Sequence, residues 1–177
     1  ATATPLAFGG DRAQVSGVIE QLTDADAFSF TSTGGAYAIA ANRDGYSGVD
    51  LKLEIYDASG AMVSQSDSAT NNQSTNVTLP AGTYYAVVKS HGNYSDIGRY
   101  ALTVQAMPSG WGAADVGDVG FAGSTAYDAA SGTWTLDGGG ADVWGTADEF
   151  RFAYQTLDGD GQIVARVNGQ ENTDGWA

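Results

Sequence analysis

Short segments of alternating apolar and polar residues, separated by turn-forming residues, constrain the fold of this chain most strongly. Residues 51–56 alternate over six positions, and Asp-Ala-Ser-Gly follows at 57–60 as a turn. Residues 83–88 are rich in β-branched and aromatic side chains, which suit a pleated, half-buried sheet. Similar segments lie at 27–30, 36–40, 100–104, 133–136, 149–154 and 162–167. Because no window combines a helical apolar stripe with a cap, we predict an all-β fold built as an antiparallel β-sandwich.

The composition changes near residues 107–110, where a Met-Pro-Ser-Gly sequence interrupts the strand-like segments. Residues 1–106 carry a net charge of −5, whereas residues 107–177 carry −9 and contain all four tryptophans. Of the 25 glycines, 14 lie after the break. We therefore predict a domain boundary here, with one sandwich in residues 1–106 and a second β module in residues 107–177.

The second part is short for a sandwich, which usually needs about 100 residues. Three or four strands would leave one apolar sheet face uncovered. The missing strands would come from residues after Ala177, from another chain or from the first domain. Because the chain begins with Ala1 rather than Met and stops soon after a strand-like segment, we expect both ends to be internal to a larger precursor.

Charge and residue content exclude several classes of function. The net charge of −14 argues against binding to nucleic acid or to anionic lipid. No apolar run approaches the roughly 18 residues of a membrane helix, so no membrane insertion is expected. The chain has no cysteine and one histidine, His91 in a loop-like sequence. Without a Gly-x-Ser-x-Gly elbow or a histidine-rich metal site, we expect no enzyme.

An ordered set of motifs covers the first part of the chain. These are residues 17–20, 23–30, 51–60, 79–85 and 98–104. In this order they resemble the bacterial pre-peptidase C-terminal domain family, and the resemblance covers residues 11–106. It implies a secreted, non-catalytic, jelly-roll-like sandwich attached to exported bacterial enzymes. Some members of that family bind calcium, and some bind collagen or other polymers.

A second resemblance covers residues 109–177. Its motifs are residues 115–117, 123–124, 140–146, 159–167 and 171–174. They resemble the start of a concanavalin-like or carbohydrate-binding-like sandwich of large secreted bacterial proteins. In that family the chain continues through further strands, so the resemblance implies a partial second sandwich.

Two pairs of carboxylates are candidate ligands for Ca²⁺, the candidate cofactor. Asp24 and Asp26 stand two residues apart at the start of a strand, a spacing that suits a hard cation with oxygen ligands. The alternative is an Asx-type turn that caps the strand entry. Asp158 and Asp160 form an Asp-Gly repeat, but Gly169 occupies the position where an EF-hand needs Glu, so a hairpin turn is the alternative.

Tryptophans of the second part are candidate sugar-binding residues. Trp144 lies in a glycine-rich segment beside Asp142, which suits an aromatic platform with a hydrogen-bonding neighbour. Trp111 is a further candidate for ligand binding. The alternative is that these rings belong to a core, as most buried aromatic residues do; Trp134, with strand-like neighbours, is predicted to be core.

Two functions remain from the sequence. The first is a non-catalytic pair of extracellular or cell-surface modules from a larger secreted bacterial protein, which binds a polysaccharide or an extracellular matrix polymer and is stabilised by calcium. The alternative is a structural subunit of a fibre, surface layer or cell-surface assembly. In that case neighbouring copies of the chain would complete the second sandwich by strand addition.

Overall fold

The computed structural model describes residues 2–45, 47–68, 71–94, 96–117, 119–120, 123–141 and 143–173. Within these ranges the chain forms strands and turns and has no helix, which confirms the all-β prediction. The part of the chain that is described therefore also lacks a helix that could span a membrane.

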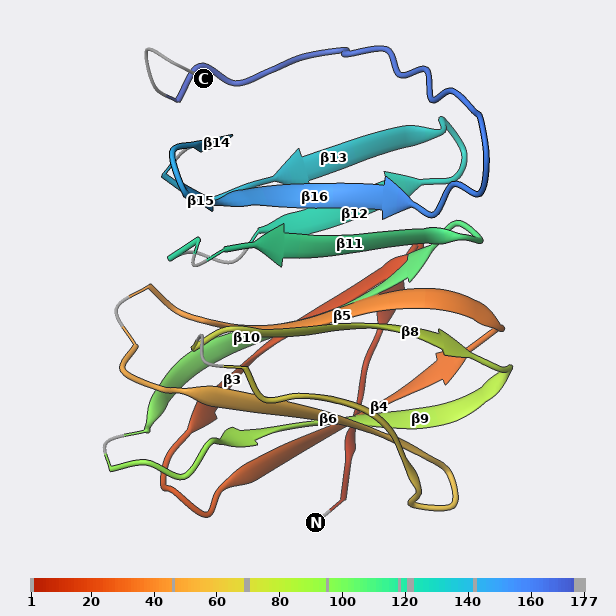
Figure 1. Ribbon diagram of the computed structural model, residues 1–177. Helices are drawn as coiled ribbons and strands as arrows, with labels where there is room; N and C mark the ends of the chain where they lie inside the picture. Colours follow the sequence, from red (N-terminus) through yellow and green to blue (C-terminus); the bar gives the residue numbers. More distant parts are fainter. Residues whose placement is uncertain are drawn as a thin grey trace.

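Two five-stranded sheets pack face to face and form the sandwich (Figure 1). The first sheet has the order β1-β4-β9-β6-β7, and its strands are Thr4–Pro5, Ala25–Ser32, Gly82–Ser90, Leu51–Asp57 and Met62–Ser66. The second sheet has the order β2-β3-β10-β5-β8, and its strands are Phe8–Gly9, Arg12–Ile19, Gly98–Met107, Gly35–Arg43 and Gln73–Leu79. Neighbouring strands are antiparallel except β1 and β4, which are parallel. The predicted antiparallel sandwich is confirmed.

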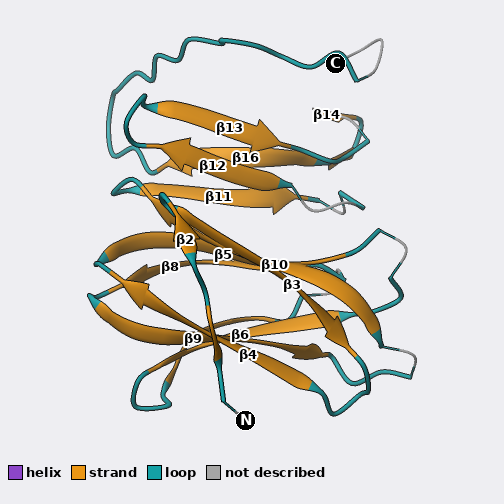
Figure 2. Ribbon diagram, turned by 180° about the vertical axis from the view of Figure 1, so that it is seen from behind, coloured by secondary structure: helices purple, strands orange, loops and turns teal. Residues whose placement is uncertain are grey.

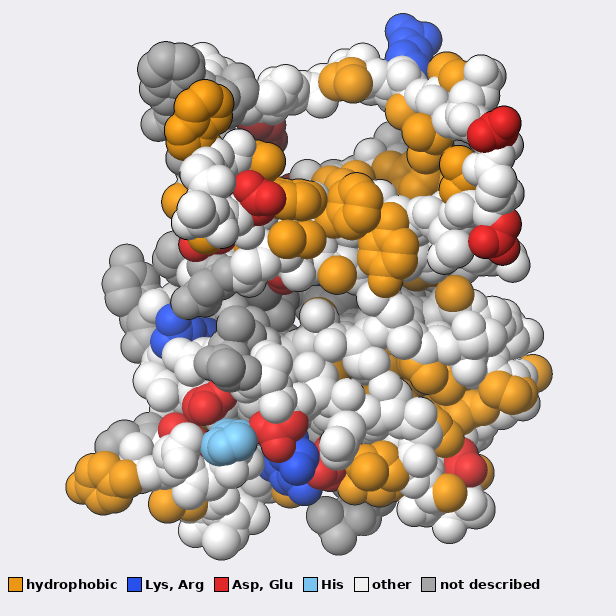
Figure 3. Space-filling view, in the orientation of Figure 1, with side chains coloured by type: hydrophobic (Ala, Val, Ile, Leu, Met, Phe, Trp, Pro, Cys, Tyr) orange, Lys and Arg blue, Asp and Glu red, His pale blue; other side chains and the backbone are white. Residues whose placement is uncertain are grey.

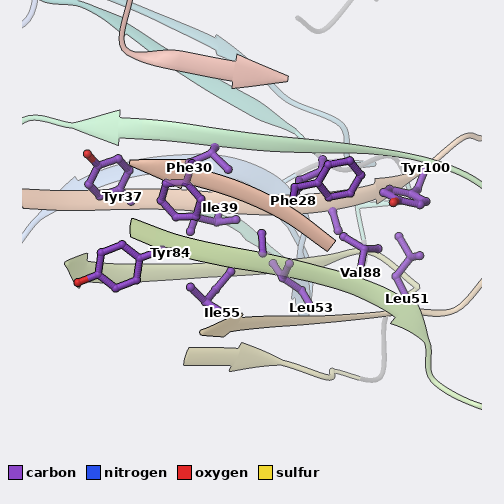
Figure 4. Packing of buried hydrophobic residues seen from close by; sticks show 14 of the residues in the cluster. Phe28, Phe30, Tyr37, Ile39, Leu51, Leu53, Ile55, Tyr84, Val88 and Tyr100 are labelled. Atoms are coloured by element: carbon purple, nitrogen blue, oxygen red, sulfur yellow. The ribbon is translucent and has the colours of Figure 1, made fainter. Parts of the chain in front are cut away.

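Alternation along the strands decides which side chains enter the core. In β6, Leu51, Leu53 and Ile55 are fully buried between the sheets. The intervening residues of β6 point to the outer face, because successive strand residues face opposite sides. The core also takes Phe28, Phe30, Tyr37, Ile39, Tyr84, Val88 and Tyr100 (Figure 4). Burial of this apolar set is the main term that stabilises the sandwich.

The second part lies on the outer face of the second sheet (Figures 1 and 2). Its strands are β11 (Trp111–Val116), β12 (Ser124–Asp128), β13 (Thr133–Asp137), β14 (Val143–Trp144), β15 (Ala147–Asp148) and β16 (Phe150–Gln155). They form three two-stranded antiparallel pairs, β11 with β16, β12 with β13 and β14 with β15. Ala113 of β11 packs against Ala38 and Met107, so a small apolar cluster joins the two parts.

Residues 156–173 follow β16 without forming a strand, so the strand predicted at 162–167 is wrong. Ile163, Val164 and Val167 are 72%, 82% and 79% exposed. Their apolar pattern suits a sheet, but a strand needs a hydrogen-bonding neighbour, and the described chain provides none at this place. Figure 3 shows an opening between this segment and the sheet of the second part.

Candidate functional site

Asp24 and Asp26 lie where the sequence placed them, at the entrance to β4. Asp24 Oδ2 accepts a hydrogen bond from the backbone N–H of Glu20 at 3.1 Å, as expected for a side chain that caps a turn. Asp26 Oδ2 accepts a hydrogen bond from the Tyr100 hydroxyl at 2.6 Å. Each carboxylate therefore has one oxygen engaged by the protein, and the calcium prediction for this pair stays a prediction.

Asp158 and Asp160 lie in the exposed segment after β16. The hairpin turn that was the alternative for this repeat does not form, because no strand follows it in the described segment 156–173. Nowhere in the described chain do three or more His, Asp or Glu side chains gather in a metal-binding arrangement. Calcium binding at this pair also stays a prediction.

The tryptophans of the second part have different surroundings. Trp144 is 82% exposed on the β14–β15 hairpin. Trp111 is half-buried against Trp134, with ring centroids 4.6 Å apart, and both pack at the edge of the small cluster between the parts. Asp142, the predicted neighbour of Trp144, lies outside the described residues. Trp144 is therefore an exposed ring, whereas Trp111 and Trp134 form a packed pair.

The outer face of the first sheet brings together residues that the sequence analysis did not single out as a site. Lys52, Glu54 and Tyr56 alternate along β6 and point away from the core. The register pairs Lys52 with Lys89 of β9 and Tyr56 with Tyr85. One end of the face thus carries charged side chains and the other end carries two neighbouring tyrosines. We call this surface the outer face.

Ion pairs connect the charged end of the outer face into one network. Lys89 Nζ lies 2.8 Å from Glu54 Oε2, and the Tyr56 hydroxyl donates to the same oxygen at 2.7 Å. Lys52 Nζ bridges Glu54 and Asp67 at 3.5 and 3.2 Å. His91 Nδ1 is 2.5 Å from Asp67 Oδ1. Figure 3 shows the histidine among acidic and basic side chains on the lower part of the molecule.

The network also shifts the pKa values of its members. Burial disfavours the charge on Glu54, whose side chain is only 7% exposed, but the hydrogen bonds from Lys89 and Tyr56 outweigh burial and lower its pKa. Burial likewise opposes the charge on Asp67, and its bonds to His91 and Lys52 still lower its pKa. The hydrogen bond to Asp67 raises the pKa of His91. All these charges are therefore favoured together near neutral pH.

A signal for the outer face is present in the sequence. The polar positions of residues 51–56 are Lys52, Glu54 and Tyr56, which the alternation of a strand places together on one face. Asp67, which pairs with Lys52, and His91, which pairs with Asp67, come from the loops that follow β7 and β9, so alternation within β6 does not reveal them. The arrangement offers charged donors, an acceptor and aromatic rings on one face of a sheet, which is chemistry for binding.

Comparisons with known proteins give similarity in fold. No family model and no curated protein matches the chain. The pre-peptidase C-terminal domain of collagenase from Bacillus anthracis is 18% identical, with a TM-score of 0.48, covering 59% of this chain and 95% of that one. Aeromonas hydrophila PliG, a periplasmic inhibitor of g-type lysozyme, is 16% identical, with a TM-score of 0.48, covering 60% of this chain and 96% of that one. The first of these two structures belongs to the family that the motifs of residues 11–106 resemble.

Proposed function

We propose that this chain is a non-catalytic, extracellular binding module that holds an extended polymer on its outer face. The observation that carries the proposal is the neighbouring pair Tyr56 and Tyr85 beside the ion-paired row of Lys52, Glu54 and Lys89. The polymer is a polysaccharide or a matrix protein. Tyrosine rings pack on the C–H faces of sugars and of proline alike, and the charged groups bond to polar substituents.

The position of the outer face supports this assignment. The second part covers the opposite sheet of the sandwich, so it leaves the outer face open (Figure 1). Its side chains come from two neighbouring strands, β6 and β9, which suits a ligand that lies across the strands. The ion pairs also hold the lysines and Glu54 in place before binding, which lowers the entropy lost when a polymer is bound.

Binding to insoluble polymers tests the proposal. We expect the chain to co-sediment with at least one of cellulose, chitin and fibrous collagen, and Tyr56→Ala with Tyr85→Ala to weaken this binding about tenfold or more. Tyr94→Ala is the matched control, because Tyr94 is 95% exposed in the loop between β9 and β10. Equal binding by the double variant and the wild type would show that the outer face is not the site.

Two further features extend the same proposal. Ca²⁺ bound at Asp24 and Asp26, or at Asp158 and Asp160, would stabilise the loops that carry them, and thermal unfolding with calcium and with a chelator measures this. Trp144, 82% exposed, offers a second aromatic surface for a sugar ring. Trp144→Ala in the same co-sedimentation assay measures its contribution.

A second candidate function, assembly into a surface structure, is favoured by the apolar groups of the second part. Phe152 is 48% exposed on β16, and Ile163 and Val164 are exposed in the segment that follows. Strand addition between neighbouring copies would bury both sets. Sedimentation equilibrium distinguishes the two functions, because a monomer across the micromolar range contradicts assembly and leaves polymer binding intact.

A further inference from the structure

A polar seam separates the sandwich from the second part. The side of the second sheet that faces the second part presents small and polar side chains, among them Ala38 and Asn42 of β5 and Gln105 of β10. Across the seam β11 contacts β5 and β8, and β12 contacts β10 (Figures 1 and 2). Asn76 helps to hold the two parts together, since its Oδ1 accepts a hydrogen bond from the Ala113 N–H at 3.3 Å.

The seam contains a cavity of about 280 Å³ that is open to solvent. Its described lining is mainly hydroxyl, amide and carboxylate, with Asn42, Ser74 and Asp115 among the polar residues and Val119 as an apolar one. The lysines and arginines of the described chain do not line it. Asp115 is already engaged, because Arg151 Nη1 lies 3.4 Å from its Oδ1 and the Gly123 N–H donates to it at 3.1 Å.

Two buried acceptors that have no hydrogen-bond partner within the described chain, Asn42 Oδ1 and Gln105 Oε1, mark the inner end of the seam. Both residues line a small inner cavity of about 20 Å³, together with Arg151, whose Nη1 is ion-paired with Asp115. Asn42 and Ser74 line both cavities. Gln105 is 2% exposed and the Arg151 side chain 5%. Buried polar atoms cost free energy unless something bonds to them, so this end of the seam is built to receive a polar group.

We infer that the seam binds a neutral polyhydroxylated ligand, a single sugar ring or the end of a sugar chain. A hydroxyl has one hydrogen to donate, so a ring hydroxyl in the larger cavity donates to Asn42 Oδ1, which lines both cavities. A water in the inner cavity donates to Gln105 Oε1. The larger cavity lies at the lower end of the size range of small-ligand sites and suits one ring. Anionic ligands are disfavoured, because the lining offers a carboxylate and the chain carries −14. Val119 supplies an apolar contact for the C–H face of the ring.

Titration followed by amide NMR tests the inference with D-glucose, D-galactose, D-mannose and N-acetyl-D-glucosamine as probes, and glycerol as a small polyol. We expect at least one sugar to shift the amides around Asn42, Ser74 and Gly123 saturably, with millimolar affinity, and glycerol to leave them unchanged. Asn42→Leu removes the unpartnered acceptor, so binding weakens about tenfold while the melting temperature holds or rises. Ser74→Ala is the second variant, in case Asn42→Leu does not fold.

The controls separate this site from the outer face. Asn93→Leu, in an exposed loop after β9, keeps wild-type affinity for the sugar. Tyr56→Ala also keeps wild-type affinity for the sugar, so the proposed sites at the seam and on the outer face are tested independently. The inference is overturned if none of the sugars shifts the seam amides up to about 100 mM. It is equally overturned if glycerol shifts them as the sugars do, or if both seam variants bind like the wild type.

Discussion

At the scale of single residues, Tyr100 shows how one contact organises the sandwich. Its ring is 2% exposed, and its hydroxyl donates to Asp26 at 2.6 Å, across 74 positions of sequence. Burial, together with this bond, raises the pKa of the Tyr100 hydroxyl well above its ordinary value, so the hydroxyl stays a donor. Gly17 lies against the ring on the neighbouring strand β3. A Cβ at Gly17 would come within 2.3 Å of the Tyr100 ring and hydroxyl.

Gly17→Ala is therefore expected to destabilise the sandwich by about 2–3 kcal/mol, because the ring must move and its bond to Asp26 must lengthen. Urea denaturation measures the free energy of unfolding. The matched control is Gly9→Ala, since a Cβ there meets nothing within 4 Å. The same loss in both variants would show that general backbone effects, and not the Tyr100 contact, decide the result.

At the scale of elements, β6 and β9 share the ion-paired network of the outer face. The lowered pKa values of Glu54 and Asp67 mean that these carboxylates contribute stability above their unfolded pKa values. That stability is lost as the pH falls through the folded pKa values. The raised pKa of His91 has the opposite sign, and its contribution is lost as the pH rises through the folded value. The network is therefore strongest between these two limits.

Glu54→Gln is expected to reduce the loss of stability on acidification. In the wild type the free energy of unfolding falls as the pH drops below 4.5, the ordinary pKa of Glu. The variant should be less stable than the wild type at neutral pH by about 1–2 kcal/mol and should approach it at low pH. Chemical denaturation across the pH range measures the slope. Glu20→Gln, on an exposed position after β3, should keep the wild-type slope; a parallel wild-type slope in Glu54→Gln would contradict the role of this carboxylate.

The elements also show where sequence reasoning succeeds. The predicted segments 51–56 and 83–88 are β6 and β9, because their alternation matches a sheet with one buried face. The segment 162–167 has equally strand-like side chains and forms no strand. Its apolar side chains show which surface the segment would bury in a sheet. The segment can form a strand only where a neighbouring strand pairs with it.

At the scale of the whole molecule, the chain has a packed sandwich and a thinner second part that ends in an exposed segment. Six of the seven lysines and arginines lie within strands. The seventh, Arg166, lies in the exposed segment 156–173. Backbone that forms a strand must open before a protease can bind it, whereas an exposed segment is accessible directly.

Trypsin is therefore expected to cut first after Arg166 and to leave the melting temperature unchanged, since this segment adds no strand to a sheet. Intact mass spectrometry over a time course identifies the first product. The internal control is Arg151, which β16 buries to 5% exposure. An early cut after Arg151 would mean that β16 opens readily and that the second part is less stable than its pairing implies.

The sequence by itself determined the all-β class and five strands of the sandwich, β4, β5, β6, β9 and β10. These follow from local alternation, which each strand carries in its own residues. Only the tertiary structure decided that Glu54 meets Lys89, that Asp67 meets His91, and that Asn42, Gln105 and Arg151 surround one cavity. Each of these sites joins residues that are distant in sequence, and its geometry depends on which sheets and loops pack together. Periodicity within a segment holds no information about that packing.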